Sequence, residues 1–513
     1  MSEEKKEEKK KEAISRRKYL STVGGLAAAA AVGWGVAGYL ASRPPAPAAV
    51  KTVTETTTVT PPKPLNIKFV KTPTVGVFEQ PVVTVVVENP WDETKTETYT
   101  LIIDGKKIET KTFTIPPHKV KACWFEPPPF TEPGTHEVKV AGVTQTLKVS
   151  DEITTVYEKY PGKIWLDWHG YTPFSLADIE KLVTPELKEK IKRMHLKWAY
   201  NAHDIADYWI VVSSKVIKDL SEEYGMEMLA ITSADWDTEK EIKNVETIIA
   251  LKPDILFSMP TDFEGSAEVH KRAAKAGIRI VYTDDRPEGF EWPRDYAGVD
   301  TCDYRGYHLL ALESMANMLR KSTKKPPYKV LQFYFGYYFL PVTTRDEITE
   351  LFIKERPDEF VLVHREGFTD PDAEVLNKTE TLLPTYPDLD AIVTPWSMPG
   401  MSAIRAAMAL GRTDIIHATS DIGDEIAMEM AKPGPPYVAL GMASWLEQAK
   451  IKFYIGVLDK AGVKLPGPVG MALPIPVNRK NLLEIYRREW AEPLGKEVPK
   501  EMEEWLKEEE ELP

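Results

Sequence analysis

The sequence predicts a two-lobed α/β body preceded by a small all-β sandwich. The main observation is an alternation of short apolar strands with amphipathic helices over residues 190–480, a pattern typical of a parallel sheet covered by helices on both faces. The alternation begins again near residue 329, which indicates two lobes rather than one sheet. Ahead of it, residues 65–150 contain short strand-like runs separated by turn signals, as in a β-sandwich.

Composition limits the possible functions. The chain has 513 residues, 43% of them hydrophobic, which is enough for several packed cores. Its net charge of -13 argues against a nucleic-acid partner, because phosphate recognition requires clustered Lys and Arg. The two cysteines, Cys123 and Cys302, fall in different predicted domains. The sequence therefore indicates neither a disulfide framework nor a cysteine-rich metal site.

The first 64 residues predict an export signal and a stalk. Arg16 and Arg17 precede the uncharged run 21–42, an arrangement that resembles a twin-arginine export signal. A run of about 22 residues can also cross ~30 Å of hydrocarbon. Because Pro44 and Pro45 follow closely and disfavour cleavage, we expect a retained anchor on an exported protein rather than a removed signal. Residues 43–64, rich in Pro and Thr, predict an extended stalk.

The all-β region is predicted from three strand-like runs, 82–87, 99–103 and 137–140, and from turn signals such as Asp104-Gly105. It resembles the immunoglobulin-like modules of surface proteins in architecture. We expect a spacer, with partner docking or carbohydrate binding as the alternatives.

The side chains that follow the strands of the α/β region are the candidates for a binding site, because ligands of such folds lie outside the carboxyl ends of the strands. In the first lobe these positions hold Tyr208, Trp209, Trp236, Asp285 and Arg286. In the second lobe they hold Arg345, Trp396 and Asp421. Aromatic faces stack on sugar rings, and Asp and Arg form paired hydrogen bonds with adjacent hydroxyls. We therefore expect a small polar ligand, most simply a sugar.

Residues 190–480 also resemble the type I periplasmic sugar-binding proteins, which include the ribose- and galactose-binding proteins. The segments that carry the resemblance are SADWDTEKEIKNVETIIALKPDILFSMPTD, AAKAGIRIVYTDDRP, YPDLDAIVTPWSMPGMSAIRAAMALG and IIHATSD. The resemblance implies a fold of two lobes that close on ligand, with Asp285 and Arg286 holding sugar hydroxyls. It also implies ligand contacts for Arg345, Asp421, Tyr208 and Trp209.

The sequence departs from that family at two positions. Trp396-Ser397 stands where many members have Asn-Asp, and a late glutamine of the family falls near Met442. These departures predict a more aromatic cleft and a larger or less polar ligand than ribose.

We expect a solute-binding protein, without cofactor or metal, that delivers its ligand to the permease subunits of an ABC-type uptake transporter. A sensory receptor with the same fold is the first alternative. An exported glycoside hydrolase that uses two of Asp235, Asp285 and Asp421 is the second; however, no HExxH, GxSxG or P-loop pattern is present.

The predicted crossovers between the lobes lie near residues 288–300, 435–445 and 468–478. The predicted domains are 1–42 (signal or anchor), 43–64 (stalk), 65–150 (sandwich), 151–189 (linker) and 190–513, with lobe 1 at 190–287 and 442–470 and lobe 2 at 297–440 and 474–490.

Overall fold

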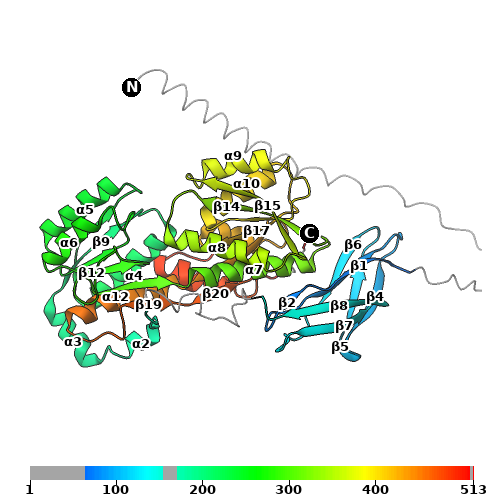
Figure 1. Ribbon diagram of the computed structural model, residues 1–513, viewed down its shortest axis with the longest axis horizontal. Helices are drawn as coiled ribbons and strands as arrows, with labels where there is room; N and C mark the ends of the chain where they lie inside the picture. The colour runs from blue at the N-terminus through cyan, green and yellow to red at the C-terminus, as the bar shows by residue number, and fades with distance from the viewer. Residues whose placement is uncertain (1–63, 154–169, 509–511) are drawn as a thin grey trace, which may run out of the picture. The chain divides into compact units, whose positions relative to one another are not determined.

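A computed structural model describes residues 64–153, 170–508 and 512–513 (Figure 1). The predicted signal, anchor and stalk lie outside the described residues, apart from Pro64. Across the described ranges, no helix has the length and apolar character needed to cross a membrane.

The region before residue 151 is an all-β module of two sheets. One sheet has the order β1 (Asn66–Lys71), β3 (Val83–Glu88) and β6 (Val120–Phe125), and all its pairings are antiparallel. The other has the order β2 (Val75–Gly76), β8 (Val143–Ser150), β7 (Gly134–Val140), β4 (Lys95–Ile103) and β5 (Lys106–Ile115). Val83, Val85 and Leu101 are buried in the core of the module. The immunoglobulin-like classification stays a prediction.

The first α/β lobe contains a six-stranded parallel sheet. Its order is β10 (Glu227–Ser233), β9 (Lys197–Ala202), β11 (Ile255–Ser258), β12 (Arg279–Thr283), β13 (Gly298–Cys302) and β19 (Val469–Ala472). Successive residues of each strand face opposite sides of the sheet. Trp198 and Tyr200 therefore join one core with α2 (Leu176–Glu180), α3 (Pro185–Met194), α4 (Tyr208–Glu223) and α12 (Trp445–Lys460), while Ala199 joins another with α5 (Thr238–Leu251) and α6 (Ala267–Lys275).

The second lobe repeats this plan with one reversed strand. Its sheet has the order β15 (Phe360–Phe368), β14 (Tyr328–Phe335), β16 (Ala391–Val393), β17 (Ile416–Ser420), β18 (Tyr437–Ala443) and β20 (Pro474–Val477), and only β20 is antiparallel to its neighbour. Its helices are α7 (Tyr304–Lys321), α8 (Leu340–Lys354), α9 (Ala373–Leu382), α10 (Ser397–Ala409) and α11 (Asp424–Ala431). The chain then forms α13 (Leu482–Tyr486), the π-helical turn η1 (Arg487–Ala491), α14 (Glu492–Leu494) and α15 (Lys500–Trp505).

The chain passes between the two sheets three times, at residues 302–304, 443–445 and 472–474. The second and third crossings lie within the predicted ranges. The first lies beyond the predicted range 288–300, because β13 still pairs with β12 and β19 in the first sheet. The predicted lobe boundary at residue 297 is therefore early. Residues 284–297 connect two neighbouring strands of one sheet, β12 and β13, instead.

Buried charges join the all-β module to the second lobe, and both belong to one unit of the chain. Lys71 donates through Nζ to the carbonyl oxygens of Leu319 at 2.9 Å and Ser322 at 2.7 Å, at the end of α7. Glu79 forms ion pairs with Arg320 at 2.9 Å and Arg356 at 3.1 Å. Buried charges need such partners, so this contact fixes the module against the lobe.

Candidate functional site

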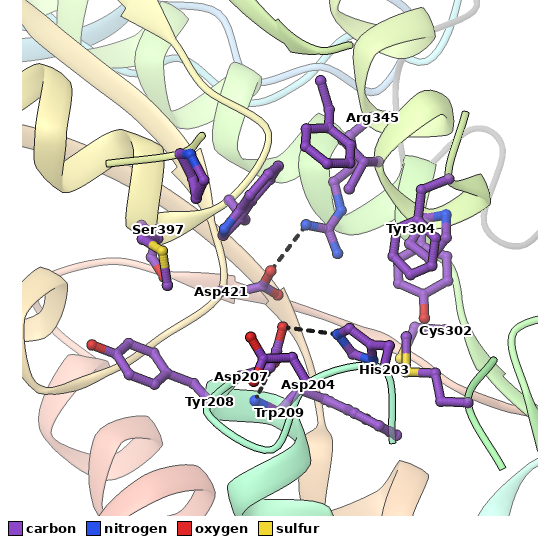
Figure 2. Close-up of a pocket in the computed structure, with 18 of the residues that line it drawn as sticks. His203, Asp204, Asp207, Tyr208, Trp209, Cys302, Tyr304, Arg345, Ser397 and Asp421 are labelled. Atoms are coloured by element: carbon purple, nitrogen blue, oxygen red, sulfur yellow. Dashed lines mark hydrogen bonds and ion pairs between the residues drawn. The ribbon is translucent and has the colours of Figure 1, made fainter. Parts of the chain in front are cut away.

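A cavity of about 300 Å³ lies between the lobes, and both lobes contribute side chains to it (Figure 2). Its position follows from the topology, because the carboxyl ends of the parallel strands of both sheets carry the loops that line it. Polar and aromatic groups both face this space. A cavity of this kind, with few polar groups among many apolar ones, is the usual form of a small-molecule site.

The polar groups of the first lobe follow β9. Asp207 begins α4 as its N-cap and accepts a hydrogen bond from the backbone N–H of Trp209 at 2.8 Å. His203 is buried, and its Nε2 lies 3.5 Å from Asp207 Oδ2. Burial opposes ionisation of Asp207, but His203 and, at longer range, Arg345 hold the pKa of this carboxyl below its usual value. The first lobe therefore presents a carboxylate to the cavity.

The polar groups of the second lobe are Arg345 on α8 and Asp421 after β17. Arg345 donates through Nη1 to Asp421 Oδ2 at 2.9 Å and to the carbonyl oxygen of Pro395 at 2.8 Å. Its guanidinium also donates to the hydroxyl of Tyr307 and lies 4.9 Å from the centre of that ring. Burial raises the pKa of Asp421 against the effect of Arg345. Figure 2 shows the Arg345–Asp421 pair facing His203 and Asp207 across the cavity.

A close backbone approach places Tyr307 beside Arg345. An added Cβ at Gly441 of β18 would lie 1.9 Å from the carbonyl oxygen of Tyr307 on α7. The carbonyl oxygen of Gly441 in turn accepts a hydrogen bond from the backbone N–H of Asp421 at 3.1 Å. Asp421 has a φ of 72°, a left-handed conformation that is uncommon outside glycine. The glycine and this turn together set the geometry of the Arg345–Asp421 pair.

Four aromatic rings from both lobes contact one another edge to face beside the polar groups, and we term this cluster the aromatic wall. It consists of Trp236, Phe335, Phe339 and Trp396, all of which line the cavity. The ring of Trp236 lies 5.3 Å from Phe339 and 6.3 Å from Phe335, and Phe335 lies 5.5 Å from Trp396. Trp236 belongs to the first lobe and the other three rings belong to the second, so the wall crosses the cleft.

Buried polar groups support the cavity from the first lobe. Gln448 on α12 accepts hydrogen bonds from Trp209 Nε1 at 2.5 Å and from Cys302 Sγ at 2.9 Å. The ammonium of Lys452 lies 4.4 Å from the centre of the Trp209 ring and 3.6 Å from Asp300. These contacts fix the indole of Trp209 in one orientation.

Six of the eight residues expected from the sequence line this cavity: Tyr208, Trp209, Trp236, Arg345, Trp396 and Asp421. Asp285 and Arg286 do not belong to the lining; they pair with each other at 3.7 Å. Their neighbour Asp284 turns inward instead, and its carboxyl group accepts a hydrogen bond from Tyr304, which does line the cavity. Met442 is buried in a core of the second lobe and is absent from the lining.

Several residues of the lining were not among the site residues predicted from the sequence. His203 directly follows β9, whereas Asp207 caps α4 and follows the same strand as Tyr208 and Trp209 do. The spacing of four between His203 and Asp207 could have been noticed. Tyr304 and Tyr307 lie in the first turn of α7, directly after the first crossing. They were not predicted, because the lobe boundary was placed too early, at residue 297. Phe335 ends β14, while Phe339 and Gln448 lie at the starts of α8 and α12. They carried no signal, because aromatic and amide residues at such positions are common in cores.

Of the three carboxylates that the hydrolase alternative requires, only Asp421 lines the cavity. Asp235 is exposed and binds Ser233 and Lys240. Asp285 lies outside the lining, as described above. Within the ranges that the structure describes, no three His, Cys, Asp or Glu side chains are grouped so that they could hold a metal ion.

Residues 199–442 match the family model described as "Periplasmic binding protein domain". Among curated proteins, none is similar enough to this chain to count as a match. Similar solved structures include an ABC transporter solute-binding protein from Mycobacterium smegmatis with bound glycerol, which is 18% identical. Its alignment covers 56% of this chain and 96% of that chain, with a TM-score of 0.50.

Two further solved structures have the same TM-score of 0.50. The 5-methylthioribose transporter solute-binding protein from Thermotoga lettingae is 17% identical, and the alignment covers 61% of this chain and 97% of that chain. A carbohydrate transporter solute-binding protein from Agrobacterium radiobacter, in complex with D-arabinose, is 14% identical over 57% of this chain and 99% of that chain. The α/β body of this chain therefore has the type I periplasmic binding protein fold.

Proposed function

We propose that this chain is an extracytoplasmic solute-binding protein that captures a small hydroxylated ligand, most simply a sugar, for an ABC-type uptake transporter. The observation that carries the proposal is the convergence of Asp207 from one lobe with Arg345 and Asp421 from the other on one aromatic cavity. Carboxylate and guanidinium groups bind adjacent hydroxyls in pairs, and aromatic faces stack on the apolar face of a sugar ring.

The arrangement also supports a mechanism of closure. Three chain crossings connect the lobes, so they can rotate as rigid bodies about these segments. A ligand that contacts both lobes binds the closed form more tightly than the open form and shifts the population toward it. The transporter subunits would then recognise the closed surface. The sugar- and polyol-binding transporter proteins of the same fold support this assignment.

The proposal also includes anchoring of the chain to the membrane through its N-terminal sequence. A retained segment 21–42 would anchor the chain outside the cytoplasm, and residues 43–64 would act as a stalk. Mass spectrometry of the N-terminus of the chain isolated from membranes tests this part. A mature protein that begins after residue 42 and fractionates without membranes would contradict it.

A thermal-shift panel of mono- and oligosaccharides and polyols tests the central proposal. A ligand at 100 times its Kd stabilises the folded form by about 2.7 kcal/mol, so a binding sugar should raise the Tm clearly. Arg345→Met should reduce the shift. Arg365→Met is a matched control, because Arg365 forms a partly exposed ion pair with Glu350 outside the cavity. A panel that leaves the Tm of the wild type unchanged would contradict the proposal.

A further inference from the structure

The cavity is divided into two chemically different parts. His203, Asp207, Arg345 and Asp421 form a polar end, where groups from both lobes act on each other: Arg345 lowers the pKa of Asp207, and Asp207 contributes to the raised pKa of Asp421. The aromatic wall adjoins this end, because the ring of His203 lies 4.5 Å from Trp236. A ligand in the cavity therefore meets hydrogen-bonding groups on one side and ring faces or edges on the other.

The aromatic wall is a poor binding surface for a second part of the ligand that carries hydroxyl groups. Phe335 and Phe339 offer no hydrogen-bonding atom, so hydroxyls placed against them would lose their partners in water without replacement. Stacking of one sugar face uses one aromatic ring, such as Trp209. The four rings of the wall are therefore suited to a further group that is flat and apolar on its faces.

The charged groups that line the cavity argue against an anionic ligand. Three carboxylates, those of Asp204, Asp207 and Asp421, line the cavity together with the guanidinium of Arg345. This guanidinium already donates to Asp421, to the carbonyl oxygen of Pro395 and to Tyr307. A phosphate group would meet excess negative charge here, whereas ribose hydroxyls can donate to the carboxylates.

We propose, on the basis of the function proposed above, that the ligand is a nucleoside. The ribose hydroxyls would bind at the polar end, with Asp207 from one lobe and the Arg345–Asp421 pair from the other. The base would stack on the aromatic wall, as bases do on aromatic side chains in single-stranded nucleic-acid complexes. Both parts of the ligand then contact both lobes.

Titration calorimetry of the full chain with adenosine, uridine, D-ribose and AMP tests this inference. At least one nucleoside should bind about ten times more tightly than D-ribose, since stacking of one base typically changes affinity by about 5- to 150-fold. AMP should bind more weakly than adenosine. A free sugar that binds as tightly as both nucleosides, or AMP that binds more tightly than adenosine, would overturn the inference and leave the proposed function intact. Absence of binding by nucleosides and by the sugar panel would overturn both.

A substitution in the wall separates stacking from support of the fold. Phe339→Leu keeps an apolar side chain and removes a ring, so the affinity for adenosine should fall about tenfold more than the affinity for D-ribose. Trp236→Leu serves as a second variant if the first does not fold. Phe78→Leu is the control, because Phe78 is an exposed ring of the all-β module and its loss should change neither affinity. Equal losses for both ligands would show that the wall only supports the fold, and would overturn the inference.

Discussion

Arg345 donates to the carboxylate of Asp421 at 2.9 Å, and the two residues come from α8 and from the turn after β17. Both are largely buried at the cavity between the lobes. A buried ion pair of this kind is costly to break, because the remaining charge loses its partner. The pair is therefore a structural support of the site as well as a candidate ligand contact.

We predict that Arg345→Met destabilises the protein by about 3–5 kcal/mol, because it leaves the Asp421 carboxylate buried without its guanidinium. The double variant Arg345→Met/Asp421→Asn should lose less than the sum of the two single losses. Urea denaturation of all four proteins measures the coupling, which should lie at about 0.5–3 kcal/mol. Additive losses would show that the pair does not act as a unit.

The candidate site residues can be ranked by how much their substitution weakens ligand binding. Asp207→Asn should weaken sugar or nucleoside binding about tenfold, since Asp207 lines the cavity and its pKa is held low, so that it accepts as a carboxylate. Asp285→Ala and Arg286→Ala should have smaller effects, because these residues pair with each other outside the lining. The family resemblance predicts the reverse order. Calorimetry of the three variants decides between the cavity geometry and the resemblance.

The sequence predicted the α/β body well because its signals are local. Helix α5 and strand β11 follow one another within the predicted range 190–480, and local signals bound the helix, since Asp237 caps it and Pro253 follows it. The exact position of the first crossing between the lobes could not be predicted from local signals, because it depends on the sheet in which β13 pairs. Local signals also could not show that Asp284 turns inward and Asp285 does not, because a shift of one residue along the chain exchanges the two positions.

The aromatic wall is a second feature that could not be predicted completely from the sequence. Trp236 and Trp396 could be named because they follow strands, but Phe335 and Phe339 belong to it through ring contacts with Trp236 across the cleft and, for Phe335, with Trp396 as well. No periodicity in the chain encodes such a contact. Asp207 is an intermediate case, because its role as a helix cap was readable while its partner His203 became evident only in three dimensions.

The contact between the all-β module and the second lobe should contribute strongly to stability. Glu79→Ala would leave Arg320 and Arg356 buried with one carboxylate fewer, so the free energy of unfolding should fall by about 3–5 kcal/mol. Glu126→Ala is the matched control, because Glu126 pairs with Lys321 at a partly exposed place. Its loss should be below about 1 kcal/mol. Equal effects of the two variants in urea denaturation would contradict this view of the contact.

Asp284 predicts a pH dependence of stability. Burial raises the pKa of this carboxyl to about 8 in the folded protein, where Tyr304, Asp300, Lys452 and Arg345 also act on it. The folded form therefore retains a proton that the unfolded chain releases above about pH 4. The contribution of Asp284 to the free energy of unfolding is therefore largest below about pH 4 and is lost as the pH rises to about 8.

Asp284→Asn removes this ionisation and keeps an acceptor for the Tyr304 hydroxyl. The free energy of unfolding of the variant should fall less between pH 5 and pH 8 than that of the wild type. Urea denaturation at these two pH values measures the difference. A variant that loses as much stability as the wild type over this range would show that Asp284 is already ionised in the folded protein.

The central claim is that the cavity between the lobes binds a small hydroxylated solute through Arg345. The most direct test is titration calorimetry of the full chain and of Arg345→Met with the panel of sugars and nucleosides. At least one of these should bind the wild type with one-to-one stoichiometry, and the folded variant should bind it at least tenfold more weakly. Unchanged affinity in the variant, or no binding of any panel member to the wild type, would contradict it.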